Sequence, residues 1–188
     1  MNPMFRTAIV AVAAVTAVTV SSSAIDAAKS NPMVGGAAMY PTKTIVENAV
    51  NSKDHTTLVA AVKAAGLVET LSGPGPFTVL APTNAAFKKL PAGTVDTLLK
   101  PENKAQLASV LTYHVVPGTI TAEDIAAKAK ANGGTATYTT VQGGMLTFAK
   151  SGSRYTIADG KGHNGRITIA DVRQSNGVIH VIDTVMLP

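Results

Sequence analysis

The chain of 188 residues contains no cysteine. Its four histidines are therefore the side chains that could take part in the widest range of chemistry. They are His55, His114, His163 and His180. No two of them have the spacing of a helical zinc motif with an acid between them, so we expect no metal site. The lack of cysteine also excludes disulfide bonds, thiolate metal sites and thiol nucleophiles.

The sequence contains no recognisable set of catalytic residues. There is neither a Gly-x-Ser-x-Gly nucleophile motif nor a Walker-type phosphate loop, and no serine or acid is paired with an evident base. The loop from Asp159 to Arg166 superficially resembles a calcium loop, but Ala170 occupies the twelfth position, where a bidentate glutamate is needed. We therefore expect a mobile hairpin connection there, no catalytic residue and no cofactor.

Two of the histidines have neighbours that favour structural roles. His114 follows Tyr113 among apolar residues, which predicts a buried side chain with hydrogen-bond partners. His180 alternates with Ile179 and Val181 in a strand-like segment, so we expect it on the opposite strand face, as a structural or half-exposed residue.

Positive charge is concentrated in the second half of the chain. The formal net charge is +5, and between residues 128 and 173 basic side chains outnumber acidic ones by seven to two. Lys150 and Arg154 lie an even number of residues apart and could share a strand face, unless Gly152 forms a turn between them. One hypothesis is that Lys150, Arg154 and Arg166 bind an acidic partner such as a polysaccharide; the alternative is that they are solvated on unrelated faces. With no tryptophan and only four tyrosines and four phenylalanines, nucleic acid is not an expected partner.

The N-terminal residues have the three parts of a secretory signal. Arg6 precedes an uncharged apolar run over residues 8–20, and the small residues Ser22 and Ala24 follow it. The run is too short to span a bilayer as a helix, which takes about 20 residues. We predict a signal peptide over residues 1–24 and a secreted or periplasmic protein, without a transmembrane anchor after cleavage.

The remaining chain predicts one domain in which helices come first and strands follow. Residues 25–39 predict a flexible lead-in to a domain over residues 40–188. Apolar residues recur at helical spacing in several segments, with Thr42, Asp54 and Thr121 as caps. The predicted helices cover 43–51, 54–66, 83–90, 95–99, 102–111 and 121–132, and the predicted strands cover 77–80, 113–116, 135–141, 145–149, 154–158, 166–170 and 178–185. This order indicates an α+β fold.

Three stretches carry a family signature, in order and at characteristic spacing. They are Phe77–Phe87 (Phe-Thr-Val-Leu-Ala-Pro-Thr-Asn-Ala-Ala-Phe), the pair Tyr113-His114, and Asn176–Asp183 (Asn-Gly-Val-Ile-His-Val-Ile-Asp). Together they resemble the first homology box, the central Tyr-His pair and the second homology box of the fasciclin (FAS1) domain family. The likeness covers roughly residues 40–188, and the surrounding sequence is similar to small secreted single-domain bacterial members.

This resemblance implies a fold, a role and an alternative role. The fold is a β-wedge packed against several short helices. The implied role is adhesion or matrix contact through a protein or polysaccharide partner, without catalysis. Some relatives instead resemble carriers of an apolar small ligand such as a carotenoid or lipid, so a secreted carrier is the alternative. The motif positions are Phe77, Thr78, Thr83, Tyr113, His114, Asn176, Gly177 and His180.

One further pair is suggested by the animal members of this family, in which an Asp-Ile pair before the second box contacts integrins. The matching positions here are Asp171 and Val172, so the match is partial. The resemblance implies a binding role for this pair, and ordinary strand packing is the alternative.

Overall fold

The computed structural model describes residues 32–188, and the predicted signal peptide lies outside the described residues. The helices are α1 (Ile45–Ala49), η1 (Lys53–His55), α2 (Thr56–Ala65), α3 (Val68–Ser72), α4 (Asn84–Lys88), α5 (Thr94–Leu98), η2 (Pro101–Asn103), α6 (Lys104–Tyr113) and α7 (Ala122–Ala131). The strands are β1 (Met33–Val34), β2 (Ala37–Ala38), β3 (Phe77–Pro82), β4 (Val115–Pro117), β5 (Thr135–Thr139), β6 (Met145–Ser151), β7 (Arg154–Ala158), β8 (Asn164–Gln174) and β9 (Gly177–Ile182).

The first described residues form a small hairpin of β1 and β2. Gly35 and Gly36 make its turn, both with positive φ, which glycine adopts without steric cost. Val34 and Met39 are buried in the core beside this hairpin. The prediction of a flexible lead-in is therefore wrong for residues 33–39, because the glycine pair there is a hairpin turn and the flanking apolar residues pack inward.

The helix ends follow the sequence signals in part. Thr44, and not the predicted Thr42, caps α1, because a glutamate lies three residues after Thr44 and completes a capping box. The Glu47 carboxylate accepts from the Thr44 N–H at 2.7 Å. Asp54 lies inside η1 and does not cap α2, which has no side-chain cap. Thr121 forms the predicted capping box at the start of α7.

Seven strands form one mixed sheet in the order β4-β3-β9-β8-β7-β6-β5. Strands β3 and β9 pair in parallel, and all other neighbours in this sheet are antiparallel. The N–H of Val141, just after β5, donates to the carbonyl of Val115 in β4 at 2.8 Å, so the sheet nearly closes. Tyr113 was predicted to begin a strand but ends α6 instead. The predicted α+β class with a β-wedge against short helices is confirmed.

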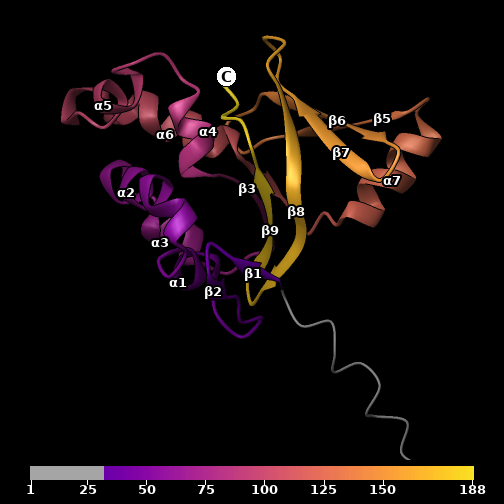
Figure 1. Cartoon of the computed structure of the whole chain (residues 1–188), viewed down its shortest axis with the longest axis horizontal. Helices are drawn as coiled ribbons and strands as arrows, with labels where there is room; N and C mark the ends of the chain where they lie inside the picture. Colours follow the sequence, from indigo (N-terminus) through magenta and orange to yellow (C-terminus); the bar gives the residue numbers. More distant parts are fainter. Residues whose placement is uncertain (1–31) are drawn as a thin grey trace, which may run out of the picture. The chain divides into compact units, whose positions relative to one another are not determined.

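Two apolar clusters lie on either side of the central strands β3 and β9, both of which are buried over most of their length. The first cluster joins helices α1 to α6 to these strands, and its members include Leu58, Leu107 and Ile179. The second joins α7 to one face of β5–β8, and its members include Ile125 and Phe148. Figure 1 shows α1–α6 on one side of β3 and β9, and α7 against β5 and β6 on the other.

Candidate functional site

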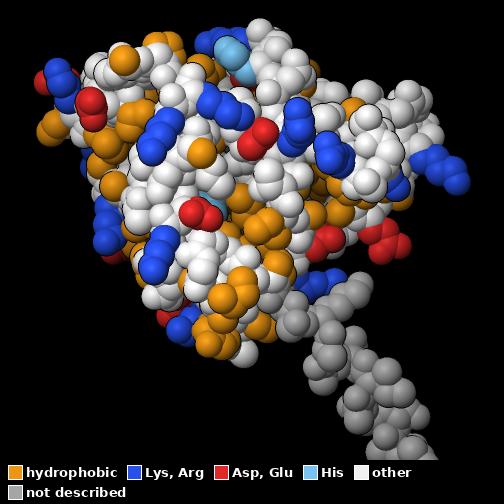
Figure 2. Space-filling view, in the orientation of Figure 1, with side chains coloured by type: hydrophobic (Ala, Val, Ile, Leu, Met, Phe, Trp, Pro, Cys, Tyr) orange, Lys and Arg blue, Asp and Glu red, His pale blue; other side chains and the backbone are white. Residues whose placement is uncertain are grey.

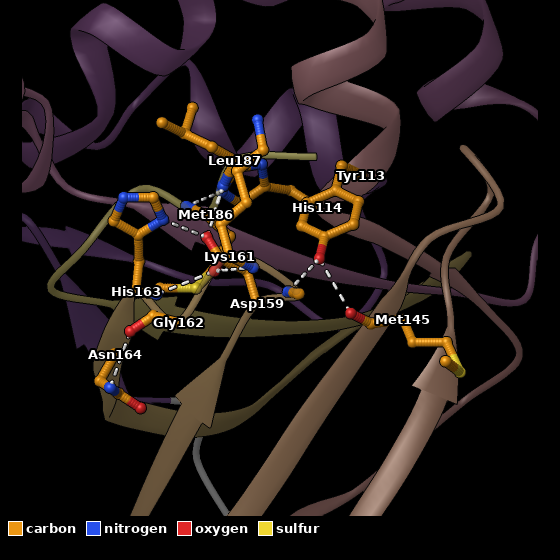
Figure 3. Close-up of polar contacts among 11 residues, drawn as sticks. Tyr113, His114, Met145, Asp159, Lys161, Gly162, His163, Asn164, Met186 and Leu187 are labelled. Atoms are coloured by element: carbon orange, nitrogen blue, oxygen red, sulfur yellow. Dashed lines mark hydrogen bonds and ion pairs between the residues drawn. The ribbon is translucent and has the colours of Figure 1, made fainter.

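The Tyr-His pair at the end of α6 contacts the C-terminal segment through His114 and the sheet through Tyr113 (Figure 3). The prediction that His114 is buried is confirmed, since it is 2% exposed. Its Nδ1–H donates to the carbonyl of Val110 at 2.8 Å, and its Nε2 accepts from the N–H of Met186 at 3.0 Å. These partners fix the neutral ring with its proton on Nδ1, because a carbonyl only accepts and an amide N–H only donates. Burial lowers the pKa of His114 to about 4, although the bond to Val110 opposes this.

Tyr113, the residue before His114, joins α6 to the sheet. Its hydroxyl donates to the carbonyl of Met145 at 2.8 Å and accepts from the N–H of Gly160 at 3.2 Å. Burial of the ring raises the pKa of the Tyr113 hydroxyl. Both functions of the hydroxyl are thus engaged, one with the start of β6 and the other with the loop after β7.

Asp159 organises the loop between β7 and β8. Its Oδ1 accepts from the N–H groups of Lys161 and His163, both at 2.9 Å. Its Oδ2 accepts from His163 Nδ1 at 2.8 Å and from the N–H of Leu187 at 3.0 Å. Burial alone would raise the pKa of Asp159, but these hydrogen bonds outweigh it and lower that pKa. We expected a loose connection here, but the loop is anchored to the C-terminal segment. An aspartate followed by glycine at a strand end is the sequence signal for such a turn.

Asp159 and His163 form a carboxylate–imidazole pair of the kind found in catalytic dyads. The carboxylate is buried and orients the imidazole, whose side chain is 47% exposed. A dyad of this kind also needs a nucleophile within hydrogen-bond reach of the second ring nitrogen. Between residues 32 and 188 no hydroxyl hydrogen-bonds that nitrogen, so the pair serves to fix the loop and lacks the third member of a triad.

His180 and Asp171 fix the junction between β8, β9 and α7. Asp171 has a φ of 58° at an irregularity in the β8–β9 register, and its Oδ1 accepts from the N–H of Ala122 at the start of α7 at 2.8 Å. His180 is fully buried; its Nε2–H donates to the carbonyl of Ile120 at 2.8 Å, and its Nδ1 accepts from the Asp171 N–H at 3.3 Å. Val172 is fully buried, so only the Asp171 member of the pair has surface to offer a partner.

The second homology box begins with Asn176, which connects distant parts of the helical half. Its Oδ1 accepts from the N–H of Ile45 at 3.0 Å. Its Nδ2 donates to the carbonyls of Leu71 at 2.8 Å and Gly73 at 3.1 Å. Its own carbonyl accepts from the N–H of Phe77 at 3.1 Å, so this one residue ties α1, the end of α3 and the first box together.

The other box residues hold the backbones close. A Cβ at Gly177 would overlap the carbonyl oxygen of Phe77, so the approach of β9 to β3 requires glycine there. Thr78 Oγ1 donates to the carbonyl of Gly118 at 2.6 Å. Thr83, where the sequence predicts that a short helix begins, caps α4 with its hydroxyl. The family motif therefore lies in the scaffold, and its polar groups are bonded to this chain itself.

The basic residues singled out from the sequence fall on two faces of the sheet. Lys150 in β6 pairs with Tyr155 in β7, and its ammonium lies 5.9 Å from the tyrosine ring centroid. Because Arg154 is adjacent to Tyr155, it points to the opposite face. Of the two alternatives left open by the sequence, the one in which Gly152 forms a turn that breaks the register is therefore correct, and Lys150 and Arg154 do not share a face. Arg154 and Arg166 do share a face, because Arg166 pairs with Thr156.

These two arginines line one open groove of about 450 Å³, together with Thr168 and Asp183. The Asp183 carboxylate accepts from the N–H of Arg166 at 2.8 Å and lies 3.6 Å from the ammonium of Lys89. Figure 2 shows Lys and Arg side chains over the upper parts of β7 and β8.

Between residues 32 and 188 no three histidine or acidic side chains cluster closely enough to hold a metal ion. No helix in the same range is both long and apolar enough to cross a membrane.

The fold and the inward-bonded motif residues define an α+β domain built on a β-wedge, and comparisons with known proteins agree. The family model described as Fasciclin domain matches residues 53–188. Protein sll1483 of Synechocystis sp. is 47% identical over 172 residues, covering 90% of this chain and 87% of that protein. The cell surface glycolipoprotein MPB83 of Mycobacterium bovis is 35% identical over 160 residues, covering 82% of this chain and 64% of that protein.

A solved structure supports the fold. A FAS1 domain pair from the insect cell adhesion molecule Fasciclin I matches with a TM-score of 0.68 at 19% identity, covering 78% of this chain and 51% of that one. The chain thus spans about half the length of that structure. The chain belongs to the fasciclin domain family, as the three sequence boxes predict.

Proposed function

We propose that this protein is an exported adhesion or matrix-interaction module that binds a protein or polysaccharide partner outside the cytoplasm and has no catalytic activity. The observation that carries the proposal is family membership together with a relative named as a cell-surface protein, MPB83, over 82% of this chain. The sequence signals for export over residues 1–24 support the location.

The hydrogen bonds of His114 and His180, two of the three buried histidines, support a non-catalytic role. Both ring nitrogens of His114 and both of His180 are bonded to backbone groups of this chain. A general base needs a ring nitrogen that can reach a substrate proton. Neither histidine has such a ring nitrogen, so both serve to position α6, α7 and the C-terminal segment.

The interior of the protein gives less support to the alternative function, which is that of a carrier for an apolar ligand. A cavity of about 40 Å³ lies between the helices and β3, lined by apolar side chains that include Ile45, Val62 and Leu111. Ligand pockets usually measure about 300–1,000 Å³, so this cavity is far too small for a carotenoid or a lipid. Such a ligand would need either a large opening of the helical layer or a surface site.

The test is a binding experiment with the exported protein purified from its host. We expect saturable retention on isolated envelope material, above that of an unrelated cysteine-free domain of equal net charge, and no co-purifying apolar molecule by mass spectrometry. Retention equal to the control domain would contradict the adhesion role. A stoichiometric apolar ligand would favour the carrier instead. N-terminal sequencing of the same preparation tests export, for which we expect a start near Ile25.

A further inference from the structure

One face of the strands β5–β8 is open and polar. The opposite face of these strands carries Phe148 and Ile157 into the apolar cluster under α7. We define the outer sheet face as the side chains that alternate away from α7, chiefly Thr137, Thr147, Arg154, Thr156, Arg166 and Thr168. All six are exposed or half-exposed. Antiparallel pairing therefore produces an ordered array of hydroxyls with two guanidinium groups at one end.

The array has a regular spacing set by the strands. Thr137 pairs with Thr147, and their Oγ1 atoms lie 3.4 Å apart. Adjacent strands lie about 4.8 Å apart, which fixes the rows of hydroxyls. Arg154 is two residues from Thr156, the partner of Arg166, so the two arginines are diagonal neighbours with a separation of about 7–8 Å at the backbone. An extended, repeating ligand can meet several of these groups at once.

The two arginines give the outer sheet face a positive charge at its β7–β8 end. The strand segments 135–139, 145–151, 154–158 and 164–170 contain no aspartate or glutamate. Neither Arg154 nor Arg166 forms a side-chain hydrogen bond or ion pair within residues 32–188, although Asp183 interacts electrostatically with Arg166 from the groove edge. The Asp183 carboxylate is already engaged by Lys89, at 3.6 Å, and by the N–H of Arg166. The arginines are therefore available to an outside anion.

The chemistry of the face favours a sugar polymer over a protein or a bilayer. Protein interfaces concentrate aromatic and large apolar anchors, and membrane surfaces are met by Trp, Tyr and aliphatic side chains. The outer sheet face has threonines and alanines in those places, and large exposed apolar residues occur only near its β5–β6 end, at Val141 and Met145. Threonine hydroxyls both donate and accept, as sugar hydroxyls do, and arginine forms bidentate bonds with carboxylates and sulfates.

We propose that an acidic polysaccharide lies across the outer sheet face, with its anionic groups on Arg154 and Arg166 and its hydroxyls on the threonine rows. This inference rests on the proposed function and narrows its partner to one class. The threonine hydroxyls orient the polysaccharide, and the arginines select an anionic polymer over a neutral one.

The test measures binding to immobilised alginate, a polyuronate, with dextran as the uncharged comparison. The charge variant is R154E/R166E. Its matched control is K63E/K104E, which changes net charge equally at exposed lysines of α2 and α6. The hydroxyl variant is T137V/T147V, which keeps β-branched side chains in the strands, and its control is T70V/T97V on exposed positions of α3 and α5.

We expect alginate binding that weakens with salt and no binding to dextran. R154E/R166E should weaken alginate binding about tenfold, or 1.4 kcal/mol, and T137V/T147V about fivefold, with both controls unchanged. Equal losses in R154E/R166E and K63E/K104E would show a diffuse charge effect and overturn the site. Loss in R154E/R166E with none in T137V/T147V would overturn the role of the threonine rows.

A second arm separates this inference from the proposed function. Envelope material is treated either with protease or with periodate, which cleaves sugars, before binding. We expect only periodate to abolish retention. If protease abolishes it and R154E/R166E still binds untreated envelopes, the adhesion role stands but a protein partner on another surface replaces the polysaccharide. If the wild type binds no envelope material at all, the proposed function fails first.

Discussion

Thr78 and Thr147 are the same residue type in strands of one sheet, yet their surroundings differ. Thr78 is 1% exposed, and its hydroxyl donates to the carbonyl of Gly118 at 2.6 Å and accepts from the N–H of Ile120 at 2.8 Å. Thr147 faces solvent in part, and its hydroxyl lies 3.4 Å from that of Thr137. The buried hydroxyl is needed by the backbone around it, whereas the outer one can exchange its partner for water or a ligand.

The same contrast separates the inner polar contacts from the outer sheet face. His114, His180, Asp159 and Asn176 are each buried and bonded to backbone groups of distant elements. The outer arginines make no such bonds. The family motif thus determines how the wedge and helices hold together, whereas the proposed polysaccharide site uses surface residues outside the motif. Three predictions test this division.

The largest effect is expected for the substitution His114→Ala. It leaves the carbonyl of Val110 and the N–H of Met186 without partners and opens a void, so we expect a loss of about 3 kcal/mol in the free energy of unfolding. Denaturant melts measure it. Alginate binding of the folded fraction should be unchanged, and an unchanged melting midpoint with lost binding would place His114 in the binding site instead.

The second prediction concerns acid. The pKa of His114 is about 4 in the folded protein, below the ordinary value of 6.5. Above pH 6.5, His114 is therefore neutral in both the folded and the unfolded chain, and the stability that depends on its neutral form is fully present. As the pH falls from 6.5 towards 4, the unfolded chain takes up the proton and the folded chain does not, which removes up to about 3 kcal/mol. Burial also lowers the pKa values of His55 and His180, so they act in the same direction.

Asp159 extends this acid sensitivity to lower pH. Its lowered pKa contributes stability that is present above the ordinary aspartate value and is lost as the pH falls through the folded value. Urea melts at pH 7, 5.5 and 4.5 check the histidine part. His114→Ala should reduce the dependence of the free energy of unfolding on pH, and Thr147→Val should leave that dependence unchanged. An equally steep dependence in both variants would show that His114 is not a source of the acid sensitivity.

The smallest effects come from the threonine pair. Thr78→Val removes a hydroxyl that satisfies two buried backbone groups, so we expect a loss of about 1–3 kcal/mol. Thr147→Val removes an outer hydroxyl and should change stability by less than about 0.5 kcal/mol. Thermal melts of both variants measure the difference. Equal losses would mean that the outer hydroxyls are also part of the scaffold.

Much of the fold could be predicted from short stretches of sequence, because the forces that set them are local. Thr121 caps α7 through a group three residues away, and the alternation in residues 135–158 follows from strand geometry. The three boxes indicated the family from residue types and order alone. The burial of His114 also followed from its apolar neighbours.

The rest depended on contacts between residues far apart in the chain. The face occupied by Lys150 was decided by one turn, since a shift of one residue in register moves a side chain to the other side of the sheet. Asp159 bonds Leu187, and Asp171 bonds Ala122, across 28 and 49 positions. No pattern along the chain contains such pairs. The sequence by itself determined the family and the Thr121 cap of α7. Only the tertiary structure decided which polar groups are bonded inside and which, like Arg154 and Arg166, remain on an open face.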